Sequence, residues 1–288
     1  MAFGRISPER CLTRLQRGDG AAEVAYTAGP DGAVLTHLYQ REPCRILFPD
    51  GEPGDPPQAV FITMSGGLTD GDRLRLQARV AAGATVTATT QAAEKIYRAS
   101  AQALDCTVDI DLSVAAGASL EWLPQETIVF DGARLRRRTA VDVAPGGRLL
   151  ACEMVVLGRV AAGERFTSGL LLDAWCVRRD GRLTWADALR LDGAAPGAAG
   201  FGDAPAVAMA VYVGDDAATH LEAARTAIDA ACALAPDLKA GATVVNGLLL
   251  ARFLGAPFDV RRALVSWLAH MRTVCLDLPA RLPRVWHV

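Results

Sequence analysis

A short sequence unit recurs along the first two thirds of the chain. "VAAGATV" at 80–86 returns as "VAAGASL" at 114–120, "VAPGGRL" at 143–149 and "VRRDGRL" at 177–183. The starts of successive units are therefore 34, 29 and 34 residues apart. A recurring unit of this length is typical of stacked supersecondary elements, because each unit buries its apolar face against its neighbours. In each unit a glycine-centred turn separates two strand-like runs, so the repeat predicts a β-sandwich or solenoid rather than a barrel.

The strand-like run before each turn alternates between apolar and polar residues. In "DRLRLQARV" (72–80) Leu, Ala and Val share one face and mainly Arg the other, and "CTVDIDLSV" (106–114) repeats the pattern with Asp. Period-two alternation predicts half-buried strands with a solvated outer face. The runs after the turns are more apolar and are predicted to be covered on both faces. Arg137, Thr139 and Asp173 interrupt the inner face of the third and fourth units, where we expect bulges or partial exposure.

The three parts of the chain are expected to pack as one compact domain of the β-rich α+β class. Residues 1–190 are predicted to form the stacked β region, 191–205 a Gly/Ala/Pro-rich loop, and 206–288 a β-α-β-α region packed on the β part. In this last part, 206–214 and 242–255 are predicted strands. Asp215 or Asp216 is expected to cap the first helix, and Asp259 the second.

Composition argues against several classes of function. A net charge of -2 without a basic stripe argues against nucleic-acid binding, and the longest apolar runs are too short for a membrane span. The seven cysteines form no CxxC pair, which is typical of reduced core cysteines in a cytoplasmic protein. The four histidines lie far apart in the sequence, so no tight His/Cys metal site is predicted. Lys95 and Lys239 are the two lysines among thirty basic residues.

The sequence contains no recognised catalytic motif. It lacks a GxSxG nucleophile elbow, a Walker A loop and a GxGxxG dinucleotide loop. The glycine-rich "SGGLTDGD" (65–72) has no lysine and no helical pattern after it, which favours a connection between strands. Asp70 and Asp72 are then expected to be solvated or to accept hydrogen bonds from backbone amides of that turn. An enzyme of this sequence would need a site assembled from distant loops.

Polar residues within and at the ends of apolar strands are more unusual. Glu121 and Glu153 interrupt apolar runs, and a buried carboxylate must be paired, hydrated or close to the surface. Gln91 and Gln125 each lie eleven residues after the first valine of their unit. The two strand ends are therefore expected to lie side by side at one edge of the stack. Their glutamines either satisfy loop backbone or form a functional rim.

Five segments follow one another over about residues 60–288, namely "GGLTDGD", "TTQAAEKIYR", "LEWLPQETIVF", "LGRVAAGERF" and the terminal "LPRVW". Together they resemble the UreD (UreH) family of urease accessory proteins. The resemblance implies a stacked β-rich fold with two helices and a non-enzymatic scaffold. It also implies three partners, UreF, the GTPase UreG and apo-urease, within a symmetric hetero-oligomer. Such a complex delivers Ni(II) to the urease active site, so the cation is transient and no cofactor is tightly bound.

On this resemblance we hypothesise two sets of functional residues. The candidates for a partner-binding rim are Gln91, Lys95, Tyr97, Arg98, Gln125 and Glu126. The candidates for a wet nickel passage are Glu94, Glu121, Glu153 and Glu164. Oxygen ligands and water suit a cation in transit, since a His/Cys cage would hold it. Glu164 has an alternative structural role, as the partner of Arg159 across a turn.

Two other functions remain open at this point. The chain could be a β-solenoid interaction module unrelated to nickel, or a hydrolase whose site is assembled from distant loops. A hydrolase would turn over substrate as an isolated chain, whereas an interaction module would not affect the metal content of any partner.

Overall fold

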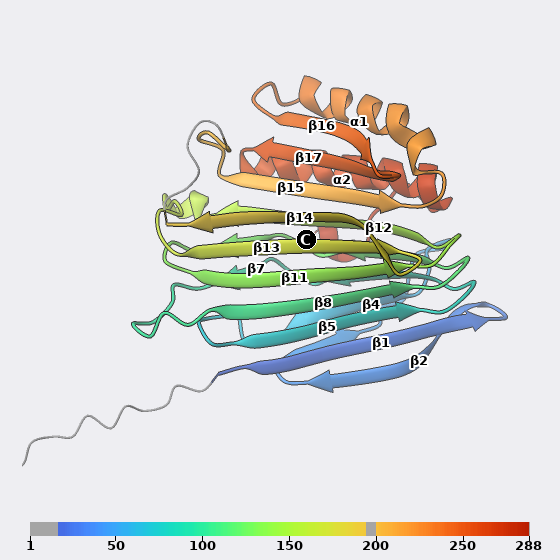
Figure 1. Ribbon diagram of the computed structural model, residues 1–288, viewed down its shortest axis with the longest axis horizontal. Coiled ribbons are helices and arrows are strands. Elements are labelled where there is room, and N and C mark those ends of the chain that lie inside the picture. Colours follow the sequence, from blue (N-terminus) through green and yellow to red (C-terminus); the bar gives the residue numbers. More distant parts are fainter. Residues whose placement is uncertain (1–16, 194–199, 288) are drawn as a thin grey trace, which may run out of the picture.

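The computed structural model describes residues 17–193 and 200–287, and its strands form two stacked sheets with two helices against one of them (Figure 1). The seven-stranded sheet has the order β14-β13-β11-β8-β5-β1-β2. Its strands are β1 (Asp19–Gly29), β2 (Gly32–Arg41), β5 (Arg73–Val80), β8 (Cys106–Val114), β11 (Arg134–Val143), β13 (Leu170–Arg179) and β14 (Arg182–Asp192). The five central strands are parallel, and β2 and β14 are antiparallel edges.

The ten-stranded sheet has a path of eight strands, β16-β17-β15-β12-β9-β6-β4-β3, with β10 beside β12 and β7 beside β10. Its strands are β3 (Cys44–Leu47), β4 (Gln58–Thr63), β6 (Thr85–Thr90), β7 (Glu94–Ile96), β9 (Ser119–Leu123), β10 (Thr127–Val129), β12 (Arg148–Leu157), β15 (Ala206–Val213), β16 (Lys239–Val245) and β17 (Leu248–Gly255). The helices are α1 (Leu221–Ala233) and α2 (Pro257–Leu276), and short 3-10 turns occupy Val160–Ala162, Ala217–His220 and Arg284–His287.

The first three repeat units form the stack that the sequence predicts. In each unit the turn carries the chain from one sheet to the other, from β5 to β6, from β8 to β9 and from β11 to β12. Their first valines lie in register, since Val80 pairs with Val114 and Val114 with Val143. The predicted burial is also confirmed, because β8 alternates between buried and less buried residues whereas β9 is buried throughout.

The fourth unit differs from the other three because its turn folds the chain back within the same sheet. Asp180 and Gly181 both have positive φ, 53° and 69°, and join β13 to β14 as a two-residue hairpin. This is the type I′ turn that Asp-Gly favours, and its twist matches that of an antiparallel strand pair. The unit is also displaced by two residues, since Val177 pairs with Val141 and not with Val143.

The same turn chemistry divides the predicted strand at 242–255. Asn246 and Gly247 have φ of 49° and 78° and join β16 to β17 as a second hairpin. The predicted helix caps are wrong, because neither helix has a side-chain cap. Asp259 lies inside the first turn of α2, which begins at Pro257, a residue suited to the first helical position.

The interruptions in the third and fourth units are buried. The described pairing of β11 with β8 and β13 contains no bulge, whereas β13 shifts register against β14 between Val177 and Arg178, so the bulge expected in the fourth unit is present. Arg137, Thr139 and Asp173 are 7%, 0% and 5% exposed. The expectation of partial exposure was wrong because Arg137 and Asp173 lie directly opposite each other and form an ion pair.

Two apolar cores hold the layers together. One lies between the sheets, and the other packs α2 on the far side of β12, β15 and β17 and α1 against α2 and β16. Of the six described cysteines, Cys44, Cys106, Cys152 and Cys275 are buried, Cys176 and Cys232 are half-buried, and all are free. Cys11 and positions 194–199 of the predicted loop lie outside the described residues. Neither α1 nor α2, the two α-helices of the described chain, has the length and apolarity to cross a membrane.

Candidate functional site

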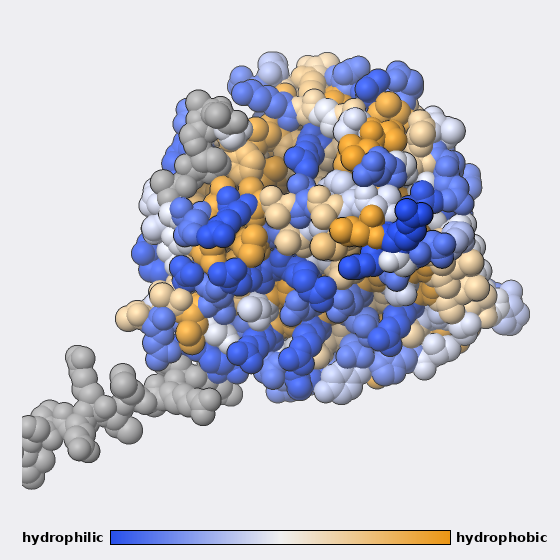
Figure 2. Space-filling view, in the orientation of Figure 1, coloured by the Kyte–Doolittle hydropathy of each residue, from blue (hydrophilic) through white to orange (hydrophobic). Residues whose placement is uncertain are grey.

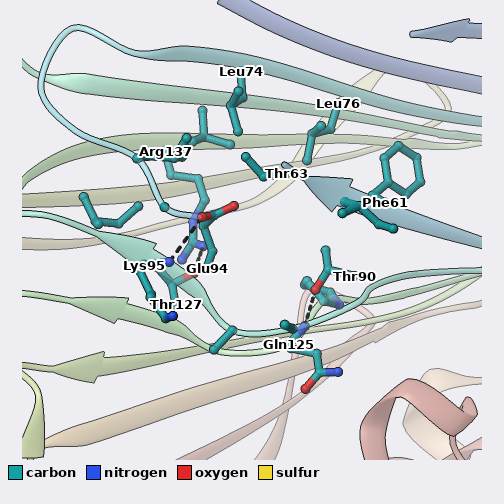
Figure 3. A pocket seen from close by; sticks show the side chains of 18 of the residues that line it. Phe61, Thr63, Leu74, Leu76, Thr90, Glu94, Lys95, Gln125, Thr127 and Arg137 are labelled. Carbon is teal, nitrogen blue, oxygen red and sulfur yellow. Dashed lines mark hydrogen bonds between the residues drawn. The ribbon is translucent and has the colours of Figure 1, made fainter. Parts of the chain in front are cut away.

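A cavity of about 220 Å³ lies between the two sheets, beside the ends of β4 and β6 and the short strand β7 (Figure 3). Apolar side chains such as Phe61, Leu74 and Leu76 form one side of it. Polar groups gather on the other side, and they come from five strands and two loops. They are Thr90, Gln91, Glu94, Gln125, Thr127, Arg137 and Glu153. A cavity with this lining can hold water or a small cation.

A buried ionic cluster forms one wall of this cavity. The guanidinium of Arg137 on β11 donates to both carboxylate oxygens of Asp173 on β13, at 3.1 and 2.6 Å, and to Thr127 Oγ1 at 2.8 Å. It also forms an ion pair with Glu153 on β12. Trp175 Nε1 donates to the second oxygen of Glu153 at 2.6 Å. One cation therefore faces two carboxylates inside the sandwich.

The electrostatics of the cluster favour uptake of a positive charge. Burial raises the pKa of Glu153 well above its usual range, and Asp173 adds to the rise while Arg137 opposes it. Burial also raises the pKa of Glu94, against opposing effects from Thr63, Arg137 and Lys95. An excess of buried carboxylate takes up either a proton or a metal cation. Carboxylate oxygens suit a hard or borderline cation.

Glu153 also lines a second cavity, of about 130 Å³, on the other side of the cluster. This cavity lies between edge strand β14 and strands β15 and β17, and Asp173, Asp187 and Arg252 contribute to it. Figure 2 shows the surface around it, where apolar residues gather toward β14, β15 and β17 and the face over β5 and β8 is mainly hydrophilic. The Arg137–Glu153–Asp173 cluster thus lies between two cavities. Within the described chain, no group of three or more His, Cys, Asp or Glu side chains converges as a metal site.

Three of the predicted rim residues, Gln91, Lys95 and Gln125, line the cavity, and the two strand ends lie side by side as the spacing of Gln91 and Gln125 suggested. Gln125 Nε2 donates to the carbonyl of Gln91 at 2.9 Å and also to that of Val285, so this glutamine satisfies loop backbone. Glu126 is half-buried and paired with Arg261. The exposed members of the set are Gln91, Lys95, Tyr97 and Arg98.

The exposed rim residues are held in place by their neighbours. Tyr97 donates its hydroxyl to the carbonyl of Gly66 at 2.8 Å and packs edge-to-face on Phe130, with ring centroids 5.1 Å apart. Arg98 forms an ion pair with Asp131. Asp131 in turn accepts hydrogen bonds from the backbone and hydroxyls of Thr167 and Ser168, which keep the pKa of its carboxyl well below the usual range despite partial burial.

The predicted passage carboxylates fall into two groups. Glu94 and Glu153 line the cavity between the sheets. Glu121 lies outside both cavities, where it binds Arg272 at 2.6 and 3.0 Å and accepts a hydrogen bond from Thr87. Glu164 also lies outside both cavities, paired with Arg159 at 2.6 Å across the turn, as the alternative expectation held.

Sequence reasoning did not include Arg137 and Asp173 among the functional candidates. Both were recognised only as residues that break the alternation of their strands. The sequence did contain a signal for the pair, because a cation and an anion occupy inner-face positions of neighbouring units. Neighbouring units pair as parallel strands, and in this pairing Arg137 lies opposite Asp173. The two-residue displacement of the fourth unit concealed this match.

Comparison with known proteins supports the resemblance. The family model for the UreD urease accessory protein matches residues 18–287. A urease accessory protein UreD from Magnetococcus marinus is 40% identical over 277 residues, which cover 93% of this chain and 94% of that protein. Those of Xanthobacter autotrophicus and of a Methylobacterium species are each 40% identical, and cover 96% and 97% of this chain and 92% and 98% of their own length. On this evidence, the chain belongs to the UreD urease accessory protein family.

Proposed function

We propose that this chain acts in the maturation of urease, as a scaffold that joins UreF and UreG to apo-urease and helps to deliver nickel. Family membership supports the role in urease maturation. The observation that carries the nickel role is the buried cluster of Arg137, Glu153 and Asp173 between two cavities.

The proposed nickel route uses Glu94 and Glu153 as successive oxygen ligands. Nickel enters at the rim beside Gln91 and Glu94, crosses the cavity between the sheets and leaves past Glu153 toward β14. Arg137 has a role in release, because its charge keeps the carboxylates from holding a divalent cation too tightly. The geometry suits transfer, since the binding groups are few and already share a cation.

Reconstitution of urease activation tests the proposed function. Apo-urease, UreF, UreG, GTP, bicarbonate and Ni(II) are combined with or without this chain, and both bound nickel and urease activity are measured. We expect activation only when the chain is present. Equal activation in its absence would reject the proposal and favour an interaction module unrelated to nickel.

A single substitution separates the scaffold role from the nickel route. Glu153→Gln keeps the shape of the side chain and removes its charge, so we expect the complex to form while nickel transfer slows by about tenfold or more. Glu222→Gln is the matched control, because Glu222 is an exposed carboxylate on α1 that pairs with Arg225 far from both cavities. Normal transfer by the Glu153→Gln variant would remove Glu153 from the route without affecting the scaffold role.

A further inference from the structure

A groove of about 820 Å³ lies on the helix-bearing side of the ten-stranded sheet, and it shares Lys95 with the lining of the first cavity. Strands β7, β10 and β12 form its floor, the first turn of α2 lies at one side, and the 3-10 turn at Val160–Ala162 lies at the other. Helix α2 packs on β12, β15 and β17. The groove is therefore the part of this face, beside α2, that the described helices leave open.

The lining of the groove has the composition of a protein interface. It is mainly apolar and includes Ile128, Phe130, Met154 and Phe258, with Tyr97 at the rim. Phe258 is 72% exposed, although burying a phenylalanine side chain is worth about 2 kcal/mol. Arginine side chains stack on two of these rings, Arg159 on Phe130 and Arg262 on Phe258. Phenylalanine, tyrosine, methionine and arginine are the residues enriched where proteins bind each other.

The backbone of the groove leaves no edge for an added strand. β10 pairs with both β7 and β12, and the outer side of β7 bonds to Leu68. Leu68 donates to the carbonyl of Lys95 and accepts from the amide of Tyr97, each at 2.7 Å. An occupant must therefore bind through side chains, and a helix lying beside α2 would complete the helical layer.

The charges around the groove select the chemistry of that helix. Its lining contains three cations, Lys95, Arg159 and Arg261, and one carboxylate, Glu126. Glu126 balances Arg261, and Glu164 balances Arg159. Across residues 17–193 and 200–287, no carboxylate lies within 4.0 Å of the Lys95 ammonium. Lys95 therefore offers an unbalanced positive charge to an acidic group of the occupant.

We propose that this groove binds an amphipathic α-helix of another protein, with its apolar face on Ile128, Phe130 and Phe258 and a carboxylate paired with Lys95. The inference rests on the proposed scaffold function and adds the binding surface and the chemistry of the bound segment.

Binding measurements on the full chain, with purified UreF and purified apo-urease as separate probes, test the inference. We expect Phe258→Ser and Lys95→Glu each to raise the Kd for one of these probes by about tenfold or more. Leu234→Ser and Lys239→Glu are the matched controls, because Leu234 is 73% exposed and Lys239 is the other lysine. The controls should leave the Kd within about twofold. Thermal melting of each variant checks that the fold is retained.

Lysine chemistry provides a second readout that does not depend on substitution. Reductive methylation followed by mass spectrometry reports Lys95 and Lys239 separately. Complex formation should protect Lys95 and leave Lys239 reactive. Zero-length carbodiimide cross-linking should join Lys95 to an Asp or Glu within a helical segment of the partner.

The outcomes separate the inference from the proposed function. If Phe258→Ser and Lys95→Glu bind both probes with the wild-type Kd, the groove is not the site and the scaffold function stands. If the unaltered chain binds neither probe, the scaffold function fails and the inference fails with it. If the variants change only self-association in sedimentation, the groove joins copies of this chain, which also overturns the inference.

Discussion

At the residue scale, the most informative feature is a guanidinium that serves two carboxylates in the core. Desolvation of three charges is expensive, and apolar side chains of similar volume often stabilise a core at least as well. The Glu121–Arg272 cluster is more balanced, since its second carboxylate, Asp55 at 3.6 Å from Arg272, also pairs with Arg281 at 3.2 Å. We therefore expect the two buried clusters to respond differently to substitution.

Arg137→Met should destabilise the fold by about 3–5 kcal/mol, because it leaves Glu153 and Asp173 buried without their cation. Removing the guanidinium also takes away the charge that opposes the raised pKa of Glu153. A carboxyl whose pKa is raised by folding contributes stability at low pH and loses it as pH rises through the folded value. Urea unfolding should thus show a variant that is most impaired at neutral pH and partly recovers in acid. A loss that is the same at every pH would contradict this account.

Glu121→Gln should also destabilise the fold by about 3–5 kcal/mol, because the buried guanidinium of Arg272 loses its closest carboxylate. Nickel transfer by the folded fraction should be unchanged, since Glu121 lies outside both cavities. The double variant Glu121→Leu, Arg272→Met is the control and should recover part of the lost stability. Slow nickel transfer by correctly folded Glu121→Gln would instead return Glu121 to the route.

At the element scale, the turn "LGRVAAGERF" shows how glycine fixes a loop beside the groove. Gly158 and Gly163 both have positive φ, 90° and 75°. A Cβ on Gly158 would lie 2.5 Å from the carbonyl oxygen of Glu164, whereas a Cβ on Gly163 would meet nothing within 4 Å. Gly158 is therefore required both by its positive φ and by the close approach of Glu164, whereas Gly163 is required by its positive φ alone.

Gly163→Ala should cost about 1 kcal/mol, the conformational penalty alone, and Gly158→Ala should cost clearly more because the backbone must also move. Thermal or urea unfolding of the two variants measures the difference. Gly158→Ala should in addition weaken partner binding, because Gly158 and Arg159 line the groove. Equal losses of stability in the two variants would show that the backbone of the turn moves to accommodate the Cβ at position 158 without further cost.

The elements also show what a sequence of this kind can predict. Alternation in β8 was predictable because a period of two is local and one face is charged. The turn at Asp180–Gly181 was predicted, but its return within one sheet was not, because the repeat implied a crossing to the other sheet. The hairpin at Asn246–Gly247 was missed because it lies within a continuous apolar run, although Asn-Gly favours a type I′ turn. The ion pair of Arg137 with Asp173 spans 36 residues, and it depends on the register of β13 beside β11, where the fourth unit is displaced by two residues.

At the scale of the whole molecule, the two cavities and the groove lie on different sides of the ten-stranded sheet. The cavities open between the layers, whereas the groove lies on the helical side. Tyr97 lines the groove, and Gln91 and Glu94 line the larger of the two cavities. Lys95 lines both the groove and that cavity. A partner bound in the groove would therefore lie next to one mouth of the proposed nickel route.

This arrangement predicts that nickel delivery depends on pH through Glu153. Burial raises the pKa of Glu153, so lowering the pH fills the site with a proton that nickel must displace. In the reconstituted system, the initial rate of nickel transfer by the wild-type chain should fall as the pH of the assay is lowered through a series of buffers. Glu153→Gln should give slower transfer that changes less over the same range, while Glu222→Gln should follow the wild type.

The partners also depend on pH, and the rate of GTP hydrolysis by UreG is measured at each pH to report that dependence. GTP hydrolysis does not involve nickel passing Glu153, so it separates the pH dependence of the partners from the protonation of Glu153. The prediction concerns the ratio of wild-type to Glu153→Gln transfer rates, in which changes common to both reactions cancel. A ratio that stays constant across the range would mean that the proton on Glu153 does not compete with nickel. Nickel would then cross the sandwich by a path that avoids the Arg137–Glu153–Asp173 cluster, and the excess carboxylate there would need a different explanation.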